Sequence, residues 1–135
     1  MEGGIHTAVE LWCMDPAAAK QQYGPIASWN TSEITNMGLL FYGKANFNGD
    51  ISRWDVSNVR GMVNMLRSAT SFNCDLSQWD VSKVMNMDLM LEGATSFTHQ
   101  LGGAWSTSTA NKYGMFRNCP GSIAGKTNNA NGTPE

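Results

Sequence analysis

A chain of 135 residues is long enough to bury the core of one domain. Its formal net charge is −2 and its nine Lys and Arg residues are scattered, which argues against nucleic acid or an anionic membrane surface as a partner because both select clustered basic residues. We expect no membrane insertion, since no apolar run approaches the ~20 residues of a span, and the first residues lack the features of a secretory signal.

Residues 1–24 are expected to form an N-terminal helical cap. Apolar spacing predicts a first helix that covers about residues 7–14. Asp15 is placed to cap a second helix over residues 16–23, which has a proline in its first turn, and Gly24 is placed to stop it. Because this region precedes a repetitive segment, we expect it to cover the open apolar end of the first repeat.

A 25-residue repeat dominates residues 25–120. The sequence of residues 54–59, WDVSNV, returns at residues 79–84 as WDVSKV, and the same offset relates ATSF at residues 69–72 and 94–97. A fixed period of this length is typical of stacked repeats. The offset defines three columns of expected core residues: Trp29, Trp54 and Trp79; Met37, Met62 and Met87; Phe47, Phe72 and Phe97.

Each repeat divides into two halves with different patterns. After Ser57, apolar residues recur at helical spacing from Val59 to Ala69, and Ser57 is placed as the helix N-cap. Residues 72–79 are too few for a helix and predict a short strand centred on Leu76. The predicted fold class is therefore α/β, a leucine-rich-repeat-like solenoid of about four coils with one short parallel strand and one helix per coil.

The C-terminal residues 121–135 form a polar tail that is rich in Asn and Gly. Such a composition cannot bury enough apolar surface to fold alone, so we expect an isolated tail to be disordered.

Together the WDVSNV, MxxML and ATSFNxDLS motifs resemble the repeat of the BspA-like bacterial surface proteins, the DUF285 family. The resemblance covers roughly residues 25–119 and is most specific over residues 47–97. The N-terminal pattern, which includes Trp12, Asp15 and Trp29, resembles family members of algae and other protists. The resemblance implies a leucine-rich-repeat-like solenoid, often at the cell surface, with no enzymatic activity.

Stacked carboxylates raise the question of a cation site. Asp50 and Asp75 occupy one column, and Asp55 and Asp80 occupy another, so clustered oxygens that suit Ca²⁺ are one interpretation. The interpretation we favour is that each carboxylate accepts hydrogen bonds from the main chain of its own turn. We therefore predict no metal site, and we assign the Met columns to core packing instead of copper or haem ligation.

No catalytic residue or cofactor is predicted. His6 and His99 are unaccompanied, and no nucleophile or phosphate-binding motif occurs. The three cysteines, Cys13, Cys74 and Cys119, form no C-x-x-C pair, and their spacing allows one disulfide without requiring it.

The predicted function is non-enzymatic binding of a protein partner through the strand face, the terminal coils or the tail, as a recognition or adhesion module. An alternative is a small accessory subunit that stabilises a larger multi-protein assembly. The residues expected on the binding face of the strands are Asp50, Ser52, Arg53, Asp75, Ser77, Gln78 and Gln100.

Overall fold

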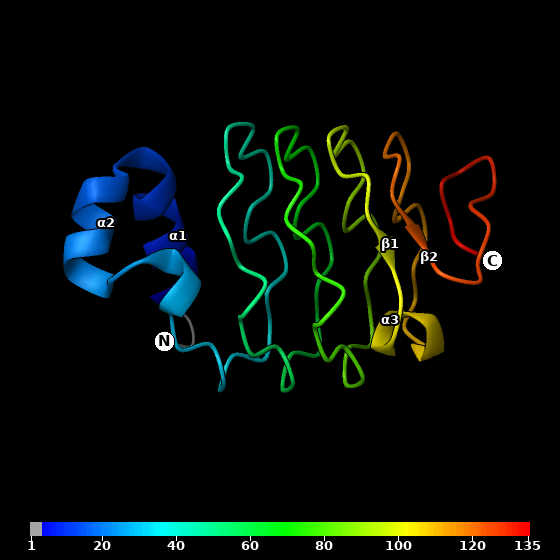
Figure 1. Ribbon diagram of the computed structural model, residues 1–135, viewed down its shortest axis with the longest axis horizontal. Coiled ribbons are helices and arrows are strands. Elements are labelled where there is room, and N and C mark those ends of the chain that lie inside the picture. The colour runs from blue at the N-terminus through cyan, green and yellow to red at the C-terminus, as the bar shows by residue number, and fades with distance from the viewer. Residues whose placement is uncertain (1–3) are drawn as a thin grey trace.

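The computed structural model describes residues 4–135, so the first three residues of the expected cap lie outside the described residues. The elements are α1 (Gly4–Met14), α2 (Pro16–Tyr23), the 3-10 helix η1 (Ile26–Ser28), β1 (Gln100–Leu101), α3 (Ala104–Thr107) and β2 (Ser122–Ile123). Helices α1 and α2 lie at one end of the molecule, successive windings of the chain follow in a row, and the C-terminus lies at the other end (Figure 1). The chain contains a small amount of both helix and strand, so its fold is mixed α/β.

Helices α1 and α2 confirm the two predicted N-terminal helices, although α1 begins earlier than expected. The Asp15 carboxylate accepts a hydrogen bond from Ala18 N–H at 3.1 Å, as an N-cap residue does. Gly24 ends α2 in a left-handed conformation, with φ 81°, and its N–H donates to the carbonyl of Lys20. Ile5 and Val9 of α1 are buried in the same core as the repeats.

The repeats are joined by main-chain hydrogen bonds along four segments, residues 36–43, 61–68, 86–93 and 111–118, which we call the ladder segments. Parallel bridges pair Asn36 with Gly61, Gly61 with Asn86, and Asn86 with Asn111. In the second ladder segment, the N–H groups that donate to the next repeat at 2.8–3.1 Å are those of Met62, Asn64, Leu66 and Ser68. The N–H groups of Met65 and Arg67, between these donors, and that of Ala69, directly after the segment, donate to a carbonyl three residues earlier. Each ladder segment is therefore a row of tight turns that is bonded to its neighbour.

The predicted helix in each repeat is wrong. Leu39, Asn64 and Leu89, one residue in each of the first three ladder segments, have φ values of 64°, 59° and 59°, which an α-helix cannot contain. The apolar spacing that resembled a helix comes from the tight turns. Ser57 caps no helix, because its N–H and hydroxyl both donate to the Asp55 carboxylate.

The strand predicted over residues 72–79 is also absent. Among the described residues, a paired strand in this half of the repeat occurs only where β1 pairs in parallel with β2. The inner repeats are linked here by tryptophan side chains instead. The indole N–H groups of Trp54, Trp79 and Trp105 donate to main-chain carbonyls of the preceding repeat at 2.8–3.0 Å. These indole bonds take the place of the expected strand pairing.

The core is built from the side-chain columns, and all nine residues of the three expected core columns are buried. The rings of Phe47, Phe72 and Phe97 lie nearly parallel, with 6.0 Å between successive centroids. Phe41 stacks on Phe47 with 4.1 Å between the ring centroids, in a column that holds leucine in the two middle repeats. The first repeat therefore carries an additional aromatic ring at its end of the stack.

The tail folds back as a hairpin, which differs from the disorder expected of an isolated tail. Thr127 and Glu135 exchange two main-chain hydrogen bonds at 3.0 and 2.9 Å. The N–H of Phe116 donates to the carbonyl of Gly132 at 2.8 Å, and that of Gly114 donates to Thr133 Oγ1 at 2.8 Å. The last ladder segment has no further repeat to bond to, and the hairpin supplies the acceptors that a further repeat would supply.

Candidate functional site

The residues predicted on the strand face lie in turns and extended segments between the ladder segments, and Gln100 alone among them is in a strand. Their side chains are exposed or partly exposed. The expected sheet is therefore limited to the β1–β2 pair, because the main-chain ladder runs through the other half of each repeat.

The four turn carboxylates each bind their own turn. Asp50, Asp55, Asp75 and Asp80 accept a hydrogen bond from the N–H two residues later at 3.0–3.1 Å. Hydrogen bonds from the serine two residues later hold the pKa of each carboxyl below its ordinary value. No group of three or more His, Cys, Asp or Glu side chains within residues 4–135 could hold a metal ion. These contacts favour the interpretation in which each carboxylate stabilises its own turn.

The two histidines make structural contacts. His6 Nε2 lies 2.8 Å from the carbonyl oxygen of Gly38, and His99 Nε2 lies 2.8 Å from that of Asn73. All three cysteines are free thiols. Within the described residues, no helix is long and apolar enough to cross a membrane.

The outward side chains of the ladder segments form a surface that the sequence analysis missed, which we call the ladder face. Leu39 and Tyr113 are 56% and 52% exposed, and Tyr42 is also exposed. A charged row accompanies them, in which Arg67 lies over the Tyr42 ring and pairs with Glu92. Because these residues were assigned to a helix, their outward direction was not predicted. The available signal was the Asn or Gly that takes the place of Leu39 in alternate repeats, since both residues favour left-handed turns.

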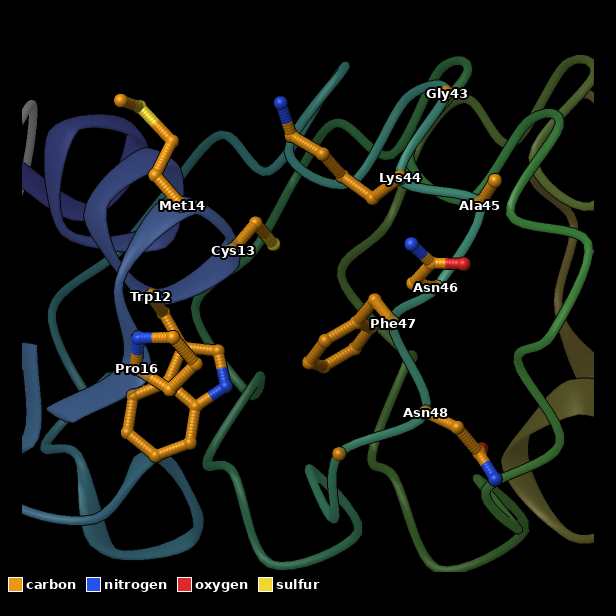
Figure 2. A pocket seen from close by; sticks show the side chains of 11 residues that line it. Trp12, Cys13, Met14, Pro16, Gly43, Lys44, Ala45, Asn46, Phe47 and Asn48 are labelled. Carbon is orange, nitrogen blue, oxygen red and sulfur yellow. The ribbon is translucent and has the colours of Figure 1, made fainter.

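A cavity of about 510 Å³, which we call the cap cleft, lies between the first two helices and the first repeat (Figure 2). This volume falls in the range of about 300–1,000 Å³ that is typical of binding pockets. Its lining residues are Trp12, Cys13, Met14, Pro16, Gly43, Lys44, Ala45, Asn46, Phe47, Asn48 and Gly49.

The walls of the cap cleft are held in place by contacts outside it. Trp12 packs edge-on against Trp29, with 5.8 Å between the ring centroids. Lys44 Nζ lies 2.7 Å from a carboxylate oxygen of Glu10, which ties the first repeat to α1. Partial burial raises the pKa of the Cys13 thiol, although the nearby Lys44 opposes that shift. The cap cleft therefore combines apolar and aromatic side chains with polar amide and main-chain groups.

The family model described as "Mycoplasma protein of unknown function, DUF285" matches residues 13–128. No curated protein and no solved structure matches the chain. The match includes every repeat and the second half of the helical cap, whereas the algal or protist type stays a prediction. The chain therefore belongs to the DUF285 family.

Proposed function

We propose that this chain is a non-enzymatic protein-interaction module, built as a leucine-rich-repeat-like solenoid of about four coils, that binds its partner through the ladder face. The row of bridges that joins residues 36, 61, 86 and 111 supports the solenoid, with tight turns in place of the expected helices. Stacked repeats of this kind expose extended surfaces suited to protein recognition.

The observation that carries this proposal is the conformation of Leu39. A non-glycine residue in the left-handed region costs roughly 1–2 kcal/mol, yet this leucine has φ 64° and is 56% exposed. The same column holds a second left-handed leucine, Leu89, which is partly buried, and Asn64 and Gly114, which adopt such a conformation more readily. Because a strained, exposed leucine contributes little to folding or solubility, we infer that its side chain serves a contact with another molecule.

The surroundings of Leu39 fit a protein partner. Exposed aromatic side chains occur at Tyr42 and Tyr113 in the first and last ladder segments. The Arg67–Glu92 ion pair lies between them, and Arg117 lies over the ring of Tyr113. Tyrosine and arginine beside apolar groups are the residue types enriched at protein interfaces. The ladder face is small, so it suits one weak contact.

The turn residues predicted from the sequence make a weaker candidate, because the carboxylates of Asp50 and Asp75 are already engaged within their own turns. The polar tail gives no reason to prefer the accessory-subunit alternative. The hairpin of residues 127–135 is held by the last repeat of its own chain.

The test is affinity capture from extracts of the source organism with three forms of the full chain, quantified by mass spectrometry. The ladder-face variant carries Leu39→Asn and Tyr113→Ser, and the matched turn variant carries Arg53→Ala and Gln78→Ala. We expect a partner captured by the unaltered chain to be retained by the turn variant and reduced at least about tenfold by the ladder-face variant, the effect of losing ~1.4 kcal/mol of binding free energy. The opposite pattern would assign binding to the turns and contradict the proposal. Circular dichroism checks that both variants are folded.

A further inference from the structure

One column of the ladder face carries an aromatic residue followed by alternating charges. It takes one residue from each ladder segment, and its members in chain order are Tyr42, Arg67, Glu92 and Arg117. The Cζ atom of Arg67 lies over the Tyr42 ring, 5.8 Å from its centroid, and the Arg67 guanidinium pairs with Glu92. The column is therefore one row along the stack, in the order aromatic, positive, negative, positive.

This row is complementary to itself when its direction is reversed. We consider two copies that face each other across a two-fold axis with their stacks antiparallel, so that position 67 of each copy lies opposite position 92 of the other. Arg67 then faces Glu92 of the second copy at two equivalent places, and both side chains are partly exposed and can be reached. At each end of the row, Arg117 faces the Tyr42 ring of the second copy, which is a cation–π pair.

The charges of the row permit a single register and direction. A shift of one copy by one repeat places Arg67 opposite Arg67 or Glu92 opposite Glu92 on the two-fold axis, depending on the direction of the shift. Parallel stacks in register would place every charge of the row opposite its own kind. Like charges that face each other across an interface suppress a pairing. The row therefore selects the antiparallel arrangement in which its two halves meet.

The exposed apolar side chains fit the same arrangement. Reversal places Leu39 opposite Gly114, where the Leu89 side chain occupies the space that a Cβ atom on this glycine would need, so leucine meets leucine. It places Tyr113 opposite Gly38, which has no side chain to obstruct the ring. Among the described residues, the large apolar side chains that are exposed all lie in or directly before a ladder segment except Met14, and the others are Leu39, Tyr42, Met85 and Tyr113.

We propose that the partner of the ladder face is a second copy of this chain, and that the two copies form a symmetric antiparallel dimer. This inference rests on the proposed function, because it names the partner of the same face. The four ladder segments span only about 15–20 Å along the stack, so the dimer is weak, with a Kd on the order of 100 µM.

Charge reversal at the two central positions tests the arrangement in the full chain. Arg67→Glu places like charges opposite each other at both central places of the dimer, and so does Glu92→Arg. A mixture of the two variants restores both pairs of opposite charge, because a copy that is acidic at both positions then faces a copy that is basic at both. We expect each variant alone to self-associate at least about tenfold more weakly, and the equimolar mixture to regain the affinity of the unaltered chain within about threefold.

The measurement is sedimentation equilibrium at about 10–1,000 µM protein, a range that brackets the expected Kd. Arg53→Glu makes the same change of charge in a turn outside the ladder face and should leave self-association unchanged. A swapped variant with both Arg67→Glu and Glu92→Arg keeps an ion pair within each chain and should still self-associate. Circular dichroism checks that every variant is folded.

The dimer is refuted if the unaltered chain stays monomeric at about 1 mM, if the single variants associate as tightly as it does, or if their mixture associates no more tightly than either alone. The capture experiment then decides the proposed function separately. Loss of a captured protein from the variant with Leu39→Asn and Tyr113→Ser would keep the ladder face as a binding surface for a different protein, whereas retention of that protein would refute both proposals.

Discussion

The hairpin of residues 127–135 can be released from the last repeat by a single substitution, Gly132→Ala. A Cβ atom at this position would lie well under 3.0 Å from main-chain atoms of Arg117, and the residue has φ 77°. Main-chain atoms cannot move aside as a flexible side chain can, so we expect the hairpin to detach. Gly125→Ala is the matched control, because Gly125 has a similar φ of 82° and a Cβ added there would meet no atom within 4 Å.

The magnitude follows from the contacts that are lost. Detachment breaks the hydrogen bonds from the N–H of Phe116, the N–H of Gly114 and the guanidinium of Arg117 to the hairpin. At about 1 kcal/mol each, with up to ~1 kcal/mol more for a buried N–H left without an acceptor, the loss in free energy of unfolding is about 3–4 kcal/mol. Gly125→Ala incurs the left-handed strain alone, about 1 kcal/mol.

Urea unfolding monitored by circular dichroism measures both variants. Hydrogen exchange should also accelerate at the amides of Gly114 and Phe116 in Gly132→Ala and stay slow in Gly125→Ala. If the two variants lose the same free energy within about 0.5 kcal/mol, the hairpin is not a structural cap and the reasoning fails.

Three further predictions concern the columns and the turns. Trp79→Phe removes the indole donor to the carbonyl of Ile51 and should lower the free energy of unfolding by about 2–3 kcal/mol. The control Trp12→Phe, at a partly exposed position, should lower it by less than ~1 kcal/mol. Equal losses in urea unfolding would contradict the role given to the indole bonds. Leu39→Asn should raise the free energy of unfolding by roughly 0.5–1 kcal/mol because asparagine tolerates the left-handed conformation better, and a lowered melting temperature would refute this. The folded-state pKa of each turn carboxyl is lowered, so these groups stabilise the fold above their unfolded pKa of about 3.9 and lose that contribution as the pH falls through the folded pKa. The test variant has Asp50, Asp55, Asp75 and Asp80 all changed to asparagine. When the pH is lowered from about 5 to about 2.5, its melting temperature should fall by less than that of the unaltered chain. An identical fall would show that other groups cause the acid sensitivity.

The sequence predicted those features that depend on local signals or on the repeat itself. Asp15 followed by a proline marks the start of α2, and the 25-residue offset identifies the buried columns of Trp, Met and Phe. Both signals are strong because a helix cap has few acceptable residues and a stack of repeats requires identical neighbours.

The prediction failed where apolar spacing alone had to distinguish a helix from a row of turns. Val59, Met62 and Leu66 recur at intervals that suit both, since tight turns also return the chain every three residues. Asn64 and the left-handed residues at equivalent positions contained the distinguishing information. The cap cleft could not be predicted, because it is formed by the absence of a neighbour beside residues 43–49 and by the direction in which α2 folds away.

The inner repeats are bonded to each other in a way that leaves their number adjustable. The contacts that close one end involve Gly38 and Lys44, and those that close the other involve residues 114–117. A duplicated copy of residues 50–74 would bring its own Trp, Met and Phe and would meet the same surfaces above and below. Each such insertion would lengthen the molecule by about 4.8 Å, the spacing of neighbouring strands, without altering either end. Length in this architecture is thus a variable that gene duplication can change one unit at a time, and the exposed surface grows in proportion.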